Sequence, residues 1–263
     1  MDLSDIRNCV ISLVQRAGEI QTGLFNKQSL RSINKGRFDI VTEADSKTDE
    51  FLTKELTKKY PTIPLLSEET SPSDYFTFRT NRYYWVIDPL DGSVNFSRGY
   101  PHYAISIALV NYNEPVLAVI YTPMNKGLYW AQNDIPHAYY QDKMISVSSK
   151  SALETSVLGT DWAHNMEKRK EVVRYIGDIC QKVKQIKMNG SAVADLMLVA
   201  KGNLDCYFHP GLKPWDMAAG ILIIKKAGGI VTKLNGENAD IFSPGLLATN
   251  GHLHKQMIDI LNK

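Results

Sequence analysis

Residues 85–96 read WVIDPLDGSVNF, and the fold of this chain depends on how this stretch is arranged. Its apolar start, Trp85–Ile87, predicts a short β-strand. Asp88 and Asp91 follow with only two residues between them, so a second carboxylate returns almost at once. Gly92 then lets the backbone turn tightly. We therefore expect two acidic side chains to converge where a strand ends.

The peptide groups around Gly92 and Ser93 suggest an anion site beside these acids. If a helix begins there, its first N–H groups point outward and favour a phosphate. Carboxylates and a phosphate are compatible at short range only when cations lie between them. An Asp-Pro turn followed by a helix-capping aspartate is the simpler explanation of DPxD on its own. The stretch alone therefore leaves a structural and a functional interpretation open.

Acidic residues occur at two further places where elements are expected to end or begin. Glu68 and Glu69 follow an apolar pair in LLSEET, and Asp216 falls in the first turn of a helix that Pro214 opens. A solvated loop explains the glutamates, and a favourable interaction with the helix dipole explains Asp216. Acidic residues at the ends of three different strands or helices in one chain are less easily explained by a separate structural reason for each.

These segments together resemble those of a known family. DPLDGSVNF resembles the DP(I/L)DG(T/S)xNF signature of the inositol monophosphatase family, LLSEET resembles its GEE segment, and PWDMAAG resembles its WDxAAG segment. DIVTEAD upstream and NGSAVADLMLVAKGNLD before PWDMAAG agree in order and spacing. The resemblance covers nearly the whole chain. It implies an α/β (α+β) fold, a layered α-β-α-β-α sandwich of the inositol monophosphatase or fructose-1,6-bisphosphatase type, commonly a homodimer that hydrolyses phosphate monoesters with Mg²⁺.

The resemblance also implies a role for each matched residue. Asp45, the last residue of DIVTEAD, is implied to support a metal and to orient the attacking water together with the Ser93 hydroxyl. A capping box with Thr42 is the structural alternative for Asp45. The implied metal ligands are the carboxylates of Glu68, Asp88, Asp91 and Asp216 and the carbonyl of Leu90, and Glu68 is also grouped with the catalytic residues. Phosphate contacts are implied for Gly92 and Ser93, and substrate contacts for Ser191, Ala192, His209 and Asp216.

The charges support this scheme independently of the name. The four implied acidic ligands carry four negative charges, and a phosphate monoester adds about −1.5 to −2, so the site alone would repel its substrate. Two Mg²⁺ ions cancel the protein charge and a third attracts the ester. Hard oxygen ligands suit Mg²⁺. We expect two or three ions, a metal-activated water as nucleophile, and no covalent phosphoenzyme.

The substrate side is less determined. His209 stands seven residues before Asp216, where inositol-hydrolysing members of the family carry a glutamate. It could bind a hydroxyl, attract a second phosphate if protonated, or lie in a surface loop. Lys35 could face the phosphate or the solvent. Trp162 and His164 lie where the family shapes its substrate rim, but they could equally pack.

Several functions remain open at this point. The leading expectation is hydrolysis of inositol monophosphate or a related polyol or sugar phosphate. The alternatives with the same chemistry are fructose 1,6-bisphosphate, the 2′-phosphate of NADP and a 3′-phosphoadenosine nucleotide. A non-enzymatic alternative is a binding module for the transcription machinery, a role that some family members have. The resemblance also implies inhibition by Li⁺.

Composition excludes other classes of protein. The 263 residues are 44% hydrophobic and 22% charged, which is typical of a fully folded globular chain. A net charge of +2 gives no basis for general attraction to nucleic acid or membranes. Three cysteines without a CxxC pair indicate neither a disulfide framework nor a zinc site. No signal peptide or membrane-spanning stretch is evident, so we expect a cytoplasmic protein that binds a small phosphorylated substrate.

The pattern along the chain predicts two halves. Apolar spacing predicts a helix over Leu3–Leu24, and a second helix from Thr42 to Tyr60. Short β-rich runs follow between residues 63 and 140. From residue 156 onward, strands and helices alternate. We expect residues 1–148 to form an α+β half with most of the metal ligands, and residues 149–263 an α/β half with Asp216 and the substrate rim.

Overall fold

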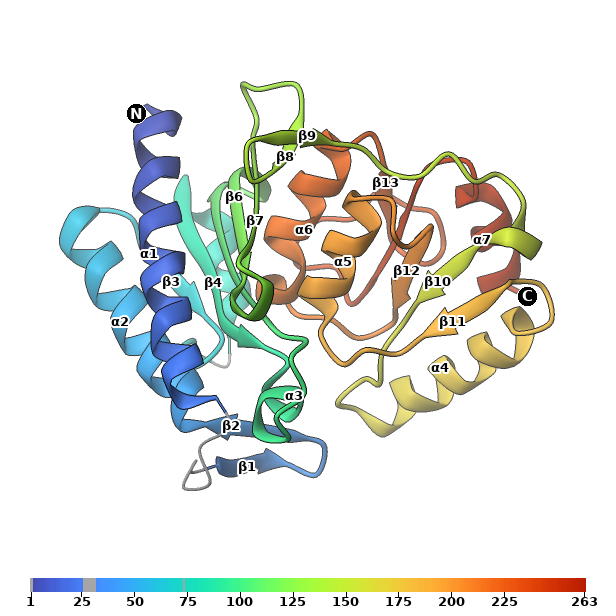
Figure 1. Cartoon of the computed structure of the whole chain (residues 1–263), viewed down its shortest axis with the longest axis horizontal. Coiled ribbons are helices and arrows are strands. Elements are labelled where there is room, and N and C mark those ends of the chain that lie inside the picture. Colours follow the sequence, from blue (N-terminus) through green and yellow to red (C-terminus); the bar gives the residue numbers. More distant parts are fainter. Residues whose placement is uncertain (1, 26–31, 73) are drawn as a thin grey trace.

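The computed structural model describes residues 2–25, 32–72 and 74–263, without the side chains of Lys35 and Asp39. Helices and sheets alternate in five layers (Figure 1), which confirms the predicted α-β-α-β-α sandwich. The outer helix layers are α1 (Leu3–Leu24) with α2 (Glu43–Lys59), and α4 (Met166–Ile179) with α7 (His254–Leu261). The middle layer is α5 (Ala192–Ala200) with α6 (Pro214–Lys226). Each sheet therefore has a helix layer on both faces.

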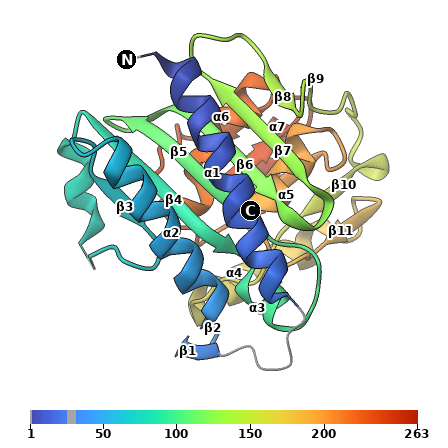
Figure 2. The same ribbon diagram turned by 60° about the vertical axis from the view of Figure 1, so that its left-hand side comes forward.

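The first sheet lies between the α1–α2 layer and the α5–α6 layer (Figure 2). Its strands neighbour one another in chain order, parallel between the first two and antiparallel thereafter. They are β3 (Leu65–Ser67), β4 (Tyr83–Asp91), β5 (Ala104–Asn111), β6 (Glu114–Thr122), β7 (Gly127–Gln132), β8 (Ala138–Tyr140) and β9 (Lys143–Ile145).

The second sheet has a crossed strand order, β11-β10-β12-β14-β13. Its strands are β10 (Val157–Gly159), β11 (Gln185–Lys187), β12 (Cys206–His209), β13 (Ile230–Thr232) and β14 (Leu246–Thr249). The remaining elements are the antiparallel pair β1 (Ser32–Gly36) and β2 (Asp39–Thr42), the short helix α3 (Ser93–Ser97), and three 3₁₀ turns at Tyr75–Thr80, Pro123–Asn125 and Leu153–Thr155.

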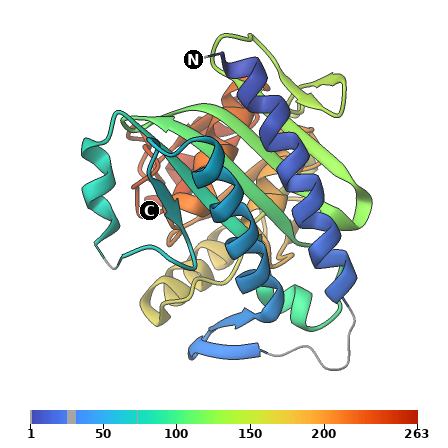
Figure 3. The same cartoon turned by 90° about the vertical axis from the view of Figure 1, so that its left-hand side faces the viewer.

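The outer helices form where the sequence predicts them. The α1 stripe packs on the first sheet, and α2 lies beside it on the same face (Figure 3). Thr42 caps α2: its hydroxyl accepts from the Ala44 N–H, and its own N–H donates to Asp45 at 2.8 Å. This is the predicted capping box, which satisfies donors that a helix start otherwise leaves unpaired.

The middle helices are apolar on nearly every side. Eight of the nine residues of α5, and most of α6, are buried because the two sheets cover opposite faces of this layer. Gly220 of α6 marks the closest approach between the helices, since a Cβ there would lie 2.6 Å from the Leu196 side chain of α5. The two sheets therefore share one continuous core through this layer.

Strand β4 differs from the expectation in an important way. The predicted strand ends at Ile87, but the observed strand continues through Asp91. In its pairing with β5, Asp88 lies opposite Ser106 and Asp91 lies opposite Ala104. Between these two pairs β4 therefore contains one residue more than β5. Pro89 has no N–H to give to the ladder, which favours such a bulge. The acids lie within a bulged strand rather than after it.

Burial of α2 against the first sheet gives a stability prediction. Leu52 is fully buried in a cluster with Trp85 and Ile107, so Leu52→Ala should lower the free energy of unfolding by about 2–5 kcal/mol. Urea denaturation measures the change. Val173→Ala on the exposed face of α4, 57% exposed, is the matched control and should change stability by less than about 0.5 kcal/mol. Equal losses in both variants would contradict this packing.

Candidate metal centre and substrate cavity

The bulge in β4 brings two carboxylates to one side of the strand. In a regular strand, residues three apart such as Asp88 and Asp91 point to opposite faces. The extra residue in the bulge reverses that alternation, and one carboxylate oxygen from each lies within 4.8 Å of the other and of an oxygen of Asp216. Asp216 reaches this point from the first turn of α6 in the middle layer. Three of the predicted acids therefore form one cluster.

Glu68, the fourth predicted ligand, enters from the neighbouring strand. It follows β3, and its backbone N–H donates to the Ile87 carbonyl of β4 at 3.1 Å. Glu68 lines the same cavity as the three aspartates, and its charge is the strongest of the neighbouring charges that raise the pKa of Asp88. Strand pairing thus carries the LLSEET segment to the acid cluster.

The cluster forms one wall of a cavity of about 510 Å³, a volume typical of small-molecule sites. The cavity is also lined by residues of the β1–β2 pair, of the segment after β10 and of the start of α4, segments that lie along the lower side of the view in Figure 1. Residues lining the cavity include Phe38, Glu68, Asp88, Leu90, Asp91, Gly92, Ser93, Tyr100, Asp161, Trp162, His164, Arg169, Ala192, His209 and Asp216.

Burial and mutual repulsion disfavour the charged forms of the clustered acids. Burial raises the pKa of Asp88, and the charges of Glu68 and Asp91 raise it further. Burial and the charge of Asp91 raise the pKa of Asp216 to about 7. One oxygen of Asp88, Oδ2, is buried without a hydrogen-bond partner among the described residues. A bound cation would relieve both the repulsion and the unsatisfied oxygen.

Asp45 forms the predicted capping box and also bonds to Ser93. Its Oδ2 caps α2 through Thr42, while its Oδ1 accepts a short hydrogen bond from the Ser93 hydroxyl. Ser93 also approaches the Leu90 carbonyl at 3.1 Å. The capping and functional interpretations are therefore compatible, because each uses a different oxygen. This arrangement links the start of α2 to the turn that follows the β4 acids.

The predicted phosphate-binding turn has a backbone conformation that requires glycine at its first position. Gly92 has φ of 100°, a region that favours glycine, and a Cβ there would lie 3.1 Å from the His102 carbonyl. Ser93 is the first residue of the five-residue helix α3. The two residues lie beside Asp91 on the cavity wall.

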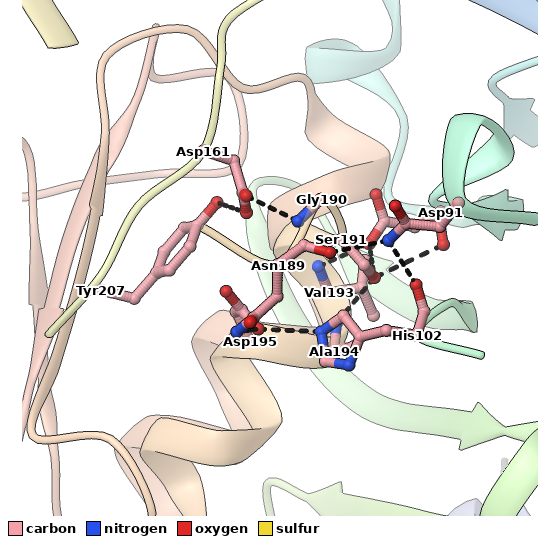
Figure 4. Close-up of polar contacts among 11 residues, drawn as sticks. Asp91, His102, Asp161, Asn189, Gly190, Ser191, Val193, Ala194, Asp195 and Tyr207 are labelled. Atoms are coloured by element: carbon pink, nitrogen blue, oxygen red, sulfur yellow. Dashed lines mark hydrogen bonds and ion pairs between the residues drawn. The ribbon is translucent and has the colours of Figure 1, made fainter. Parts of the chain in front are cut away.

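A polar network reaches Asp91 from the second half of the chain (Figure 4). The Ser191 hydroxyl donates a short hydrogen bond to Asp91 Oδ2, and the Val193 N–H donates to the same oxygen at 2.8 Å. Both donors belong to the start of α5, where Ser191 is the capping residue. Asp91 therefore accepts hydrogen bonds from donors at the N-terminus of α5, although Asp91 and Ser191 are 100 positions apart in the sequence.

The segment before α5 is braced by a second acid. Asp195 Oδ1 accepts from His102 at 2.9 Å and from the Asn189 amide at 2.9 Å. The Asn95 amide bridges the same two residues, donating to the His102 and Asn189 carbonyls at 2.7 Å each. Figure 4 shows these groups surrounding the Gly190–Ser191 segment. Asp161 completes the brace by accepting from the Gly190 N–H at 2.7 Å.

The structure corrects the interpretation of His209. It is buried at the end of β12, 3% exposed, and so it is not a surface-loop histidine. Burial lowers its pKa to about 3, so protonation to attract a second phosphate is excluded near neutral pH. Its Nδ1 accepts from the Gly211 N–H at 3.0 Å, and the ring also bonds to the Trp162 backbone. His209 also lines the cavity, so its contact with a substrate hydroxyl stays a prediction.

The remaining predicted site residues lie at or beside the cavity where the structure describes them. Ser191 supports Asp91, and Ala192, Trp162 and His164 line the cavity. The side chain of Lys35 lies outside the described part of the structure. Sequence reasoning did not single out Arg169 or the brace around Asp195. Only the latter left a signal, because Asp195 interrupts an otherwise apolar helix.

The chain was compared with known proteins. A family model described as "Inositol monophosphatase family" matches residues 2–263. Inositol monophosphatase 1 of Solanum lycopersicum is 33% identical over 98% of this chain and 95% of its own length. Nus factor SuhB of Xylella fastidiosa is 34% identical over 88% of this chain and 83% of its own. A crystal structure of the extragenic suppressor protein suhB from Bartonella henselae has a TM-score of 0.90 at 32% identity, covering 98% and 99% of the two chains.

The raised pKa of Asp216 predicts a pH-dependent stability of the metal-free protein. Between the unfolded pKa of about 3.9 and the folded pKa of about 7, the folded state keeps a proton that the unfolded state releases, so stability falls as pH rises. Asp216→Asn cannot ionise, and its stability relative to wild type should rise by on the order of 2 kcal/mol between pH 4 and pH 8. Urea unfolding in EDTA at both pH values measures this.

Asp259→Asn, an exposed acid on α7, provides the control for this experiment. Its stability relative to wild type should be nearly the same at the two pH values. A stability difference for Asp216→Asn that is also constant across this range would contradict the electrostatic description of the cluster.

Proposed function

The chain belongs to the inositol monophosphatase family and is a phosphoric monoester hydrolase, and from that premise we propose that it hydrolyses a small phosphate monoester with Mg²⁺ at the acid cluster. The observation that carries the proposal is the convergence of Asp88, Asp91 and Asp216 within 4.8 Å of one another on a cavity wall. Two carboxylates of β4 and one of α6 have no evident structural reason to meet, since they repel one another.

The residues present fit Mg²⁺ as the cofactor. The donors are all oxygens, which this hard cation prefers, and the set contains none of the thiolates or paired imidazoles that favour softer metals. The unpartnered Oδ2 of Asp88 points to a ligand that hydrogen bonds do not supply. We propose that Glu68, Asp88, Asp91 and Asp216 hold the metal, with the Leu90 carbonyl as a further ligand.

The surrounding residues suggest how the reaction proceeds. When bound, Mg²⁺ neutralises phosphate charge and lowers the pKa of a coordinated water. We propose that Ser93, fixed by its bond to Asp45, orients the attacking water, and that Glu68 assists as a further catalytic group. Burial raises the pKa of Asp45, which makes its carboxylate a better proton acceptor. Water then bonds to phosphorus as the ester P–O bond breaks, and the leaving alkoxide takes up a proton.

Phosphate and substrate contacts follow the same logic. We propose that the amides of Gly92 and Ser93 hold the phosphate, while Ala192 and Asp216 face the leaving group across the cavity. The substrate class extends from inositol monophosphate and related polyol or sugar phosphates to fructose 1,6-bisphosphate, the 2′-phosphate of NADP and 3′-phosphoadenosine nucleotides. We further propose that His209, which lines the cavity, contacts a substrate hydroxyl in its neutral form.

A second candidate function comes from the comparisons. One relative carries the name Nus factor SuhB, and two others the name putative Nus factor SuhB. We propose binding to the transcription machinery as an additional role. It would not use the acid cluster, so a cellular phenotype of gene loss that Asp91→Asn fully rescues would support it.

We also propose that the protein is cytoplasmic and forms a homodimer. Within each chain, we propose that residues 1–148 and residues 149–263 form two halves. Light scattering coupled to size-exclusion chromatography tests the oligomeric state. In the described residues no helix is long and apolar enough to cross a membrane.

The metal assignment predicts the effect of one substitution. Asp91→Asn should reduce phosphate release by at least on the order of 100-fold, because it removes a charged ligand. EDTA should abolish the wild-type activity and Mg²⁺ should restore it. Inorganic phosphate release from a panel of the esters named above measures both effects. Asp142→Asn, an exposed acid in the β8–β9 turn, is the matched control and should retain full activity. Hydrolysis that persists in EDTA would refute the proposed cofactor.

Lithium provides an independent check on the metal site. Li⁺ in the millimolar range should inhibit hydrolysis by replacing one Mg²⁺, and raised Mg²⁺ should weaken the inhibition. Rates measured across a grid of both ions test this competition. Turnover that is unaltered by Li⁺ would place the site outside the lithium-sensitive type.

A further inference from the structure

Arg169 is a cation on the cavity wall that lacks a counter-charge. It lies in the first half of α4 and is half-buried, and it lines the same cavity as the acid cluster. Among the described residues, no carboxylate pairs with its guanidinium. Its neighbours on α4 differ in this respect: Lys168 pairs with Glu171 at 2.8 Å, and Lys170 pairs with Glu167 at 3.0 Å. The one cation of this group that faces the cavity is the one left without an acid.

The guanidinium is nevertheless held firmly in place. Its Nε donates to the Ala163 carbonyl at 2.7 Å. Its central carbon lies 3.7 Å from the centre of the Phe38 ring and 5.6 Å from that of Trp162. These contacts fix the group from two segments of the chain and use only one of its three nitrogens. The two terminal nitrogens form no hydrogen bond to described residues, so both can donate to a ligand.

A fixed guanidinium with two free terminal nitrogens matches a phosphate in charge and in shape. Arginine donates two parallel hydrogen bonds to such an anion, and each is stronger than a neutral hydrogen bond. The acid cluster, which lines the same cavity, is the proposed site of the phosphate that is cleaved. The cavity therefore contains a second place for an anion, and its volume of about 510 Å³ accommodates a ligand with two phosphates.

We propose that Arg169 is a specificity-determining residue that binds a second phosphate, carried by the leaving group of the substrate. This inference rests on the proposed phosphatase function and narrows it. Among the substrate classes considered above, it favours bisphosphates of sugars or nucleosides over esters with one phosphate, such as inositol monophosphate. His209 cannot supply this recognition because it is buried and bonded to the protein. Arg169 takes the place in recognition that the sequence suggested for His209.

Matched pairs of substrates test the proposal with the purified Mg²⁺-loaded protein. Each pair differs by one phosphate that is not cleaved: fructose 1-phosphate with fructose 1,6-bisphosphate, and adenosine 3′-phosphate with adenosine 3′,5′-bisphosphate. We expect at least one bisphosphate to have a kcat/KM roughly 10- to 100-fold above its partner, as expected for hydrogen bonds to a charged group. The sugar and nucleoside pairs distinguish the two sources of the second phosphate.

Substitution of the arginine assigns the preference to it. Arg169→Gln should raise KM for the preferred bisphosphate by roughly 10-fold or more, with little change in kcat, and should leave hydrolysis of its monophosphate partner unchanged. Unchanged monophosphate hydrolysis also shows that the variant folds. Arg169→Lys should restore part of the preference, since it keeps the charge but loses the paired donors. Arg174→Gln, on the same helix but outside the cavity lining, is the control and should behave as wild type.

The outcomes separate this inference from the function on which it rests. Hydrolysis of monophosphates and bisphosphates with equal kcat/KM, or a preference that Arg169→Gln leaves intact, overturns the role of Arg169 and leaves the phosphatase function standing. Release of phosphate from no ester of either kind overturns the proposed function itself. Loss of activity on both members of a pair in Arg169→Gln would show a general structural effect and would also overturn the specificity role.

Discussion

The acid cluster depends on a one-residue bulge in a buried strand. Without it, alternation along β4 would direct Asp88 and Asp91 to opposite faces of the sheet, one toward α1 and α2 and the other toward α6. The bulge directs both carboxylates toward the middle helix layer, where Asp216 lies at the start of α6. Pro89 favours this irregularity, and β5 on one side and β3 on the other hold the strand in place. The acids therefore meet because of the backbone geometry of β4, in spite of the repulsion between their charges.

The cluster also joins the two sheets of the molecule. Asp91 belongs to the first sheet, but two of its hydrogen bonds come from the start of α5, whose preceding segment is tied to Asp195, His102 and Asn95. Burial raises the pKa of Asp91, and the hydrogen bonds from Ser191 and the Val193 N–H offset part of this shift. The groups that link the first sheet to α5 are therefore the ones that orient the carboxylate of Asp91.

Much of this arrangement could be predicted from the sequence, and the failures have physical causes. Apolar spacing predicted α1 with its observed bounds, and the capping pattern predicted the start of α2. Short strands such as β11 and β14 were missed because three or four residues carry too little periodicity to be recognised. The spacing within DPLD predicted that Asp88 and Asp91 converge, whereas their meeting with Asp216 was implied by resemblance to the family. The environment of His209 could not be foreseen, because tertiary packing alone buries it. The division at residue 148 stays a prediction.

The apolar middle layer has a consequence for synthesis of the protein in the cell. The ribosome releases the first sheet through Ile145 before α5 and α6 exist, and about 80 residues separate that strand from the end of α6. At roughly 5–20 residues per second, the inner face of the sheet is without its cover for several seconds. An uncovered β-surface of Val, Ile, Leu and Tyr side chains is prone to association with other nascent chains. The emerging polypeptide therefore has a window in which a chaperone such as a ribosome-bound holdase would find its target.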